Sequence, residues 1–251
     1  MYMIQALKAG EQGGVPGPEV YYQAHFDRHY TLAFYIWLIQ GEGRTLLVDT
    51  GLPADADRWS ARTQQVKGPQ AYWKALATPE ALLAQAGVRP EQVEHVILSS
   101  LGGYAAGNVR LFPNAQIHLS KQGWLEHLVP TPPWPRRRPG PIVAWLVAEA
   151  FDRVHLVDRE ATVVPGVNAF ETGGHHRSSL AIAVETNKGK AIIADSIFYY
   201  GNVEGGPVLG ITESVFECYA AYDRIRREAA IVLPAHDPAV LERHPGGIIS
   251  R

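Results

Sequence analysis

The sequence predicts an α/β fold in one domain, and three observations carry that prediction. Apolar, β-rich runs alternate along the chain with helical patterns, and the turn residues Gly and Pro stand between them. The 251 residues, 46% apolar and 10% aromatic, are enough to bury one large core. No internal repeat, low-complexity tract or linker divides the chain. We therefore expect residues 1–251 to form a single domain, with either two packed sheets covered by helices or one mixed sheet.

The first clear element along the chain is a hairpin. Thr31–Ile39 and Thr45–Val48 are β-rich runs that are separated by the Gly-containing turn GEGR. The second run stops at Asp49, because Gly51 and Pro53 turn the chain there. We expect Asp49 to orient a neighbouring side chain rather than to react.

The remaining elements follow from helix punctuation and from short apolar runs. One helix has Thr78 as its N-cap, Pro79 at its first position, Glu80 in its first turn and Gly87 just past its end. Further strands are expected over His95–Leu98, Ala115–Leu119, Val154–Val157, Gly166–Glu171, Leu180–Glu185, Lys190–Ala194 and Ala230–Leu233, and further helices over Gln122–Leu128, Pro141–Phe151 and Glu213–Glu228. On the last of these helices, five side chains are spaced to form an apolar face: Phe216, Tyr219, Ala220, Tyr222 and Ile225.

Charge and cysteine content exclude several classes of protein. Lys and Arg number 23 against 25 Asp and Glu, a formal net charge of −2, so no overall basic field would bind nucleic acid. The single cysteine, Cys218, forms neither an internal disulfide nor a cysteine zinc site. The first residues lack the pattern of a secretion signal, and no apolar run approaches the roughly 20 residues of a membrane helix. We expect a cytoplasmic protein with a small-molecule substrate and no membrane or nucleic-acid partner, with homodimer formation left open.

Three polar residues follow apolar runs at the ends of predicted strands. His175 follows the strand and glycines of ETGGHH, Asp195 follows KAIIA, and His236 follows AIVLPA. Two imidazoles and one carboxylate can bind a divalent metal ion, or can act as base and orienting group without one. Taken singly, each is equally consistent with a structural polar group. Spacing alone does not choose between these interpretations.

Ordered motifs over nearly the whole chain resemble the metallo-β-lactamase fold superfamily, and within it the N-acyl homoserine lactonase branch. The motifs are VDTGLP after the hairpin, HVILSS with AAGNVRLFPNAQIHLS, VVPGV with ETGGHH, AIIADS, and the final LPAHD. The resemblance implies a four-layer αββα sandwich with the site at one edge of the two sheets. It also implies a hydrolase of the lactonase group.

The segment that supplies most of the metal ligands in that family differs in this chain. In the family it reads H-x-H-x-D-H-A-G-G and provides four of the seven ligand positions of a two-metal site, usually zinc. Here the four positions hold residue types that bind zinc poorly: Ser100, Gly102, Tyr104 and Ala105. By the resemblance, His175, Asp195 and His236 keep the other three positions, with Asp195 at the position that bridges the metals. We therefore expect no dinuclear zinc site.

Three functions are compatible with these residues. In the first, which we favour, a hydrolase acts without metal on a small cyclic ester, amide or related carbonyl compound. Asp195 orients His175 or His236, that histidine acts as the base, and Tyr104 donates to the developing oxygen charge. In the second, His175, Asp195 and His236 bind one divalent ion, Zn or Fe. In the third, the chain is a non-catalytic ligand-binding protein. No cofactor is the first expectation, and one divalent metal ion is the alternative.

Four further residues are candidates for contact with the substrate. Arg177 directly follows the two histidines and could hold a substrate carboxylate, although a surface role fits equally well. Tyr199 and Tyr200 follow Asp195, where lactonases of this type place a tyrosine near the substrate carbonyl, and we expect them, with the preceding Phe198, to wall the pocket. Ser100 offers a loop hydroxyl, since the nucleophile motif G-x-S-x-G is absent. The basic run at 134–138, WPRRR, is a candidate lid.

Overall fold

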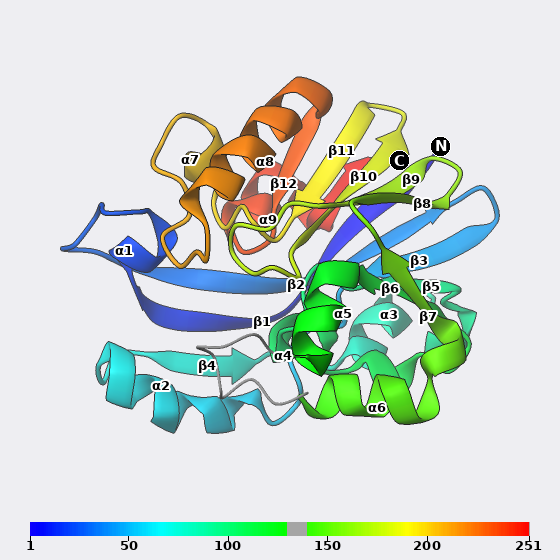
Figure 1. The fold of residues 1–251 in the computed structure, drawn as a ribbon, viewed down its shortest axis with the longest axis horizontal. Coiled ribbons are helices and arrows are strands. Elements are labelled where there is room, and N and C mark those ends of the chain that lie inside the picture. Colours follow the sequence, from blue (N-terminus) through cyan, green and yellow to red (C-terminus); the bar gives the residue numbers. More distant parts are fainter. Residues whose placement is uncertain (130–139, 251) are drawn as a thin grey trace.

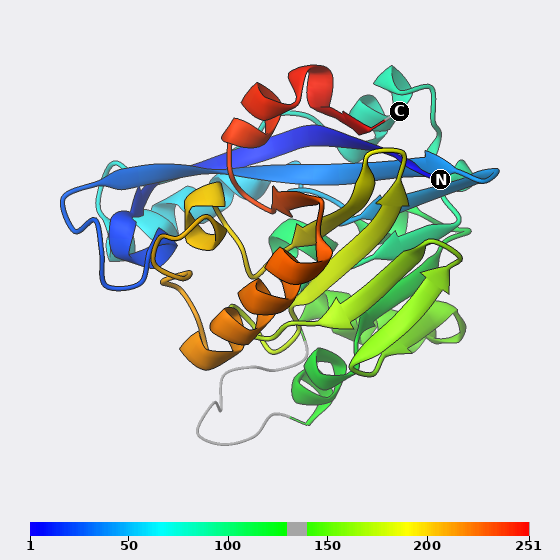
Figure 2. The ribbon, with the colours of Figure 1, turned by 90° about the horizontal axis from the view of Figure 1, so that it is seen from above.

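The computed structural model describes residues 1–129 and 140–250, so the candidate lid at 134–138 lies outside the described residues. Two β-sheets pack against each other (Figures 1 and 2). The first has the strand order β13 (Ile248–Ser250), β1 (Met3–Pro16), β2 (His29–Gly41), β3 (Arg44–Val48), β5 (His95–Ile97), β6 (Gln116–Ser120) and β7 (Val154–Val157), with β4 (Tyr72–Ala75) paired to β1. The second has the order β12 (Ile231–Pro234), β11 (Gly189–Ala194), β10 (Leu180–Thr186), β9 (Val167–Glu171) and β8 (Glu160–Val164).

Helices cover the outer faces of both sheets, as Figure 1 shows. The helices are α1 (Gly17–Val20), α2 (Trp59–Lys67), α3 (Pro79–Gln85), α4 (Gly103–Ala106), α5 (Lys121–Leu128), α6 (Pro141–Glu149), α7 (Tyr200–Val203), α8 (Val215–Glu228) and α9 (Ala239–Arg243). Leu83 of α3 and Leu146 of α6 pack with Leu38 of the first sheet. Tyr222 of α8 packs with Ile192 of the second sheet. The order helix, sheet, sheet, helix confirms the four-layer αββα sandwich.

Strand β2 contributes side chains to two apolar clusters at once. Tyr35, Trp37 and Ile39 belong to the cluster between the sheets. Ile36 and Leu38, which point to the opposite face, belong to the cluster beneath the helices. A strand that is buried on both faces needs apolar residues at every position, and this explains its uninterrupted run of apolar residues.

Most elements occur where the sequence predicts them. Strands β2 and β3 form the expected antiparallel hairpin, and so do β10 and β11. Helix α3 begins after Thr78, whose Oγ1 accepts a hydrogen bond from Ala81 N at 3.3 Å. Gly87 follows the helix with a φ of +71°, a conformation that glycine adopts without strain.

The apolar face predicted on α8 is partly wrong. The side chains of Phe216 and Tyr219 are 86% and 52% exposed. The helix instead buries the stripe Cys218, Ala221, Tyr222 and Ile225. This stripe has the spacing i, i+3, i+4, i+7, and its small members Cys218 and Ala221 let the helix approach the second sheet closely.

Loops from both sheets meet at one edge of the sandwich. Strands β3 and β5 run parallel in the first sheet, and β11 and β12 run parallel in the second. The loops that follow the two strands of each pair therefore begin at the same edge of that sheet. Backbone hydrogen bonds tie these loops to strands of the other sheet: Leu180 N of β10 donates to Ser99 O at 2.8 Å, and Ala33 N of β2 donates to His236 O at 2.9 Å. Within residues 1–129 and 140–250, no helix has the length and apolarity needed to cross a membrane.

Candidate functional site

Asp195, the first residue after β11, is the centre of the site. Its side chain is completely buried and receives contacts from three other segments of the chain. Ser179 Oγ donates a hydrogen bond to Oδ2 at 2.8 Å, and the Tyr104 hydroxyl donates one to Oδ1 at 3.2 Å. His236 Nε2 lies 3.6 Å from the same Oδ1. The structure thus brings together Tyr104, Asp195 and His236.

The charge state of Asp195 explains why donors surround it. Burial by itself raises the pKa of this carboxyl group, but its contact with His236 lowers the pKa to about 2. The group is therefore ionised at neutral pH and only accepts hydrogen bonds. The Ser179 and Tyr104 hydroxyl groups donate to it, and it favours a protonated His236 over a neutral one.

Both candidate histidines hold their Nδ1 atoms against backbone carbonyls. His236 Nδ1 lies 3.0 Å from Ala33 O, and His175 Nδ1 lies 2.6 Å from Ile211 O. Because a carbonyl oxygen only accepts, each Nδ1 carries a proton and donates it. The lone pair of a neutral ring is then on Nε2. In His236 this Nε2 is the atom that faces Asp195.

The two histidines share an apolar neighbour. The ring centroid of Phe198 lies 4.9 Å from that of His175 and 4.5 Å from that of His236, edge to face in both cases. Burial, followed by the charge of His176, lowers the pKa of His175 to about 3. His175 is therefore neutral over the whole physiological range of pH, and its Nε2 acts as an acceptor.

Ser100 and Tyr104 form a chain of hydroxyl groups that ends at Asp195. Ser100 is completely buried, and its Oγ donates to the Tyr104 hydroxyl at 3.0 Å. Burial, and then the charge of Asp195, raises the pKa of Tyr104 well above its usual value. Tyr104 therefore keeps its proton and donates it toward the carboxylate.

A cluster of aromatic side chains packs against the His236 ring. The Phe34 ring lies 4.8 Å from the His236 ring, 5.5 Å from the Tyr104 ring and 5.2 Å from the Trp73 ring between centroids. Trp59 of α2 packs edge-on against Trp73 at 5.1 Å. These rings leave His236 only 4% exposed and give it apolar surroundings on this side.

Asp49 lies behind the loop that follows β5. Its backbone has a φ of +62°, and its carboxylate accepts hydrogen bonds from Ser99 N at 2.8 Å and from Ser99 Oγ at 2.7 Å. Burial raises the pKa of Asp49 to about 7. Asp49 thus orients Ser99, which directly precedes Ser100 in the loop after β5.

Three sequence-predicted substrate contacts lie away from Asp195. Arg177 is 55% exposed, and its Nε pairs with Glu126 Oε1 at 3.0 Å. The Tyr199 hydroxyl donates to Thr31 O at 2.5 Å, and Tyr200 lines a different pocket. Since the chain enters α7 at Tyr200, the residue that reaches the two histidines is Phe198, three positions after Asp195.

Two residues of the site were missed by reasoning from sequence. Ser179 is one of two adjacent serines after GGHHR, and no pattern distinguishes it from its neighbour. Phe34 lies inside an apolar run that reads as core. Only the pairing of strands places these side chains beside Asp195 and His236.

The groups that donate hydrogen bonds to Asp195, directly or through Tyr104, are hydroxyl groups, which bind zinc poorly. Within the described ranges, no group of three or more His, Cys, Asp and Glu side chains is placed to hold a metal ion. The hydroxyl groups on or near the carboxylate belong to Ser100, Tyr104 and Ser179. Zinc prefers imidazole, thiolate and carboxylate ligands, so this set does not fit the two-zinc site of the family.

Comparison with known proteins gives matches in sequence and in structure. A model of the metallo-β-lactamase superfamily matches residues 33–99. N-acyl homoserine lactonase AiiB of Agrobacterium fabrum (strain C58) is 28% identical over 173 residues, which are 64% of this chain and 62% of that protein. The match therefore spans less than two thirds of the relative's length.

Two solved structures have closely similar backbones over nearly the whole chain. One is an N-acyl homoserine lactone hydrolase with the product N-hexanoyl-L-homoserine bound at its catalytic metal centre, and the other is a mutant of B. thuringiensis AiiA with N-decanoyl-L-homoserine bound at the active site. Each gives a TM-score of 0.77 at 18% identity and covers 96% of this chain and 95% of its own. At this level of identity the likeness is one of fold.

Proposed function

This chain has the metallo-β-lactamase fold in its lactonase-like form, and we propose that it is a hydrolase that opens a small cyclic ester, amide or related carbonyl compound by acid–base catalysis without a dinuclear zinc site. One observation carries the proposal. Asp195, which the resemblance places at the metal-bridging position, accepts hydrogen bonds from Tyr104 and Ser179 and faces His236. An ionised carboxylate beside a histidine can orient the ring and stabilise its protonated form, which supports the histidine as a base.

His236 is the proposed base. Its Nδ1 proton is held by Ala33 O, so a proton taken from water goes to Nε2. The positive charge that results lies 3.6 Å from the ionised Asp195, which stabilises it. The same proton is then delivered to the leaving oxygen or nitrogen when the ring opens. His175 stays neutral and accepts a hydrogen bond from water or substrate at Nε2.

Tyr104 is the proposed donor to the substrate carbonyl. The bond from its hydroxyl to Asp195 is 3.2 Å long, which is weak for a hydrogen bond between oxygens. A carbonyl oxygen that gains negative charge can therefore replace Asp195 as the acceptor. Ser100 donates to the same hydroxyl at 3.0 Å and so strengthens it as a donor.

We propose the substrate class from the aromatic side chains that pack around the two histidines and from the names of the similar proteins. Phe34, Trp73 and Phe198 favour an uncharged, partly apolar molecule. The matched relatives are named for the hydrolysis of N-acyl homoserine lactones. Lactones with acyl chains of different length are therefore the first compounds to test, followed by cyclic amides.

A second candidate function is that of a mononuclear metal enzyme. The observation that favours it is the hydrogen bond from Nδ1 of His175 and of His236 to a backbone carbonyl, because metal-binding histidines are usually held in this way. With Asp195, these residues would supply two imidazoles and one carboxylate, a set that suits Zn or Fe(II), but the three side chains would have to move closer together than they lie in this structure to hold one ion. The bound ion would then polarise the substrate carbonyl.

One experiment separates these functions. Lactones and cyclic amides are offered to the protein as purified and after dialysis against chelator, and the metal content is measured by elemental mass spectrometry. Equal hydrolysis at a metal content near zero supports acid–base catalysis. Hydrolysis that requires about one ion per chain, lost together with that ion in His175→Ala, overturns it in favour of the mononuclear enzyme. Absence of turnover with every compound supports a ligand-binding protein instead.

A further inference from the structure

Helix α8 carries two large aromatic side chains on its outer face. Phe216 is 86% exposed and Tyr219 is 52% exposed, although their spacing in the sequence predicts both as core. The helix lies in an outer layer of the sandwich, with its buried stripe against the second sheet (Figures 1 and 2). Accessible aromatic side chains are typical of protein–protein interfaces. The outer face of α8 is therefore a candidate interaction surface.

Four exposed residues form one line along this face. They have the spacing i, i+4, i+7, i+11, which places side chains on the same side of a helix: Phe216, Ala220, Asp223 and Arg227. We call these four residues the outer line of α8. Phe216 and Arg227 are its two ends, roughly three helical turns apart. Ala220, near the middle, has a small side chain, so another helix can approach α8 closely there.

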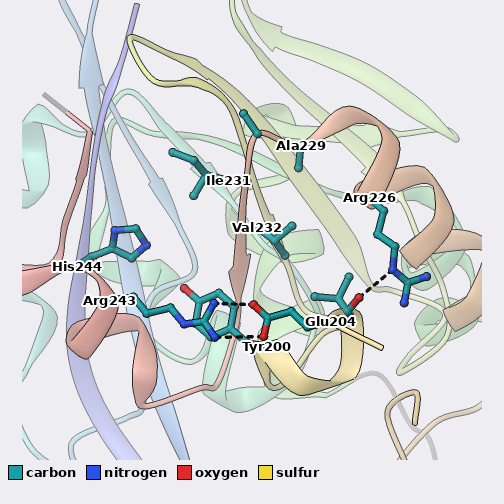
Figure 3. Close-up of a pocket in the computed structure, with 10 residues that line it drawn as sticks. Tyr200, Glu204, Arg226, Ala229, Ile231, Val232, Arg243 and His244 are labelled. Atoms are coloured by element: carbon teal, nitrogen blue, oxygen red, sulfur yellow. Dashed lines mark hydrogen bonds and ion pairs between the residues drawn. The ribbon is translucent and has the colours of Figure 1, made fainter. Parts of the chain in front are cut away.

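The last turn of α8 contains two arginines, Arg226 and Arg227, that differ in their partners. Arg226 turns toward α7, where its Nε donates to Val203 O at 2.8 Å (Figure 3). Its Nη1 also lies 3.2 Å from Asp223 Oδ1, so these two charges balance each other. The side chain of Arg227 is exposed and has neither an ion pair nor a hydrogen bond with the residues that the structure describes. Arg227 is thus the cation that remains available to a partner.

The outer line complements itself when a second copy of α8 runs antiparallel to it. Phe216 of each copy would then face Arg227 of the other, and a guanidinium against an aromatic ring is a favourable cation–π contact. Glu217, an exposed carboxylate next to Phe216 in the first turn, would add a negative charge near that arginine. In the middle, Ala220 would face Asp223, whose charge is balanced within its own chain. A parallel copy would instead bring the two Arg227 side chains together, which repel each other.

We propose that the outer line of α8 binds a second copy of this chain in antiparallel orientation, which gives a two-fold symmetric dimer. The symmetry repeats the contact between Phe216 and Arg227, so each dimer contains it twice. Helix α8 has 14 residues, and one pair of helices of this length buries less than the ~800 Å² per partner of a standard interface. We therefore expect a weak dimer, with a Kd of about 10 to 100 µM.

Sedimentation velocity of the full chain, from about 1 µM to about 1 mM, tests the association. We expect a monomer at the lowest concentration and mainly a dimer at the highest. Phe216→Ser should weaken the dimer at least tenfold, and Arg227→Gln roughly tenfold, because two contacts are lost in each dimer. Phe151→Ser, on a phenylalanine that is 64% exposed outside α8, is the matched control. A monomer at every concentration, or a dimer that Phe216→Ser leaves unchanged, overturns the proposal.

Cross-linking tests the orientation of the two copies. In the antiparallel dimer the two Ala220 residues lie close together, whereas the two Ala230 residues, past the end of α8, lie far apart at opposite ends. A short bismaleimide should therefore link two chains of Ala220→Cys but not two chains of Ala230→Cys, which alters an equally exposed alanine. The unchanged protein should give no product, because Cys218 is buried. Equal cross-linking of both variants, or of neither, overturns the antiparallel dimer.

The stability of the single chain gives a further test. Because the Phe216 ring is exposed, Phe216→Ser should leave the Tm unchanged at a concentration of about 1 µM, where we expect the monomer. A fall in this Tm would mean that the ring packs within its own chain, which contradicts its proposed role. None of these measurements needs a substrate, so their outcome does not depend on whether the chain is a hydrolase.

Discussion

The loops that meet at Asp195 come from two regions with different chemistry. The loop after β5 supplies neutral hydroxyl groups, those of Ser100 and Tyr104. The loops of the second sheet supply the carboxylate of Asp195 and the imidazoles of His175 and His236, each held at Nδ1 by a backbone carbonyl. The second region keeps an arrangement that suits metal or proton chemistry, and the first places proton donors against it.

The comparison indicates that the loop after β5 determines which groups contact Asp195, whereas the histidines are held independently of that loop. Each histidine ring is held by a hydrogen bond from its Nδ1 to a backbone carbonyl oxygen. Neither carbonyl belongs to the loop after β5, so the residues of that loop do not affect these bonds. Substitutions in that loop can therefore change the partners of Asp195 without disturbing the histidines. The hydrogen bond from the Tyr104 hydroxyl to Asp195 directly connects the loop after β5 with the loops of the second sheet.

The largest effect is expected from removal of the charge at the centre. Asp195→Asn can no longer stabilise a protonated His236, so hydrolysis should fall about 10²- to 10⁴-fold. The measurement is kcat/KM with the best lactone from the panel. Asp158→Asn, on a carboxylate that is 62% exposed, is the matched control. Activity within threefold of the unchanged protein would remove Asp195 from the proposed mechanism.

Removal of the hydrogen bond between Tyr104 and Asp195 is expected to have the next largest effect on hydrolysis. Tyr104→Phe keeps the ring but loses the hydroxyl, so kcat should fall about 10²-fold with little change in KM. Tyr219→Phe, on a side chain that is 52% exposed, is the control. An unchanged kcat would show that the loop after β5 takes no part in the reaction.

The close approach of Gly102 to the Tyr104 ring is expected to have a smaller effect, on stability rather than on activity. A Cβ at Gly102 would lie 2.5 Å from Tyr104 Cε1, so Gly102→Ala should lower the free energy of unfolding by about 1–3 kcal/mol. The cost should be smaller in Tyr104→Ala, where the ring is absent, and urea unfolding measures both. At Gly140 a Cβ would meet no atom within 4 Å, which makes Gly140→Ala the control. Equal costs with and without the ring would contradict this packing.

The smallest expected effect concerns the residue behind that loop. The pKa of Asp49 is raised to about 7 in the folded protein, above its ordinary value of 3.8, so stability falls as the pH rises from the ordinary value to about 7 and levels off above it. Asp49→Asn cannot ionise, and asparagine tolerates the positive φ of this position. The variant should therefore gain about 1–3 kcal/mol relative to the unchanged protein between pH 5 and pH 8 in urea unfolding. A constant difference across this range would show that Asp49 does not titrate there.

The sequence by itself determined the elements whose signals are local. Capping by Thr78 and Pro79 placed α3, and the alternation of apolar runs with turns placed the β2–β3 and β10–β11 hairpins. Asp195 and His236 were also singled out as candidates from the sequence, because each follows an apolar run. These signals need only the residues next to them in the chain, and so they can be read without the fold.

Only the tertiary structure decided the rest, since the contacts that matter join residues far apart in sequence. Strand β1 contains Gly13 and Gly14 and shows no regular pattern, but β2, β4 and β13 pair with it. Ser179 and Phe34 reach the site because strands from both sheets end or pass beside it. Tyr199 and Tyr200 turn away from the site because α7 begins there, and this leaves Phe198 between the two histidines. A side chain's direction depends on the packing around it, and that packing exists only in the folded chain.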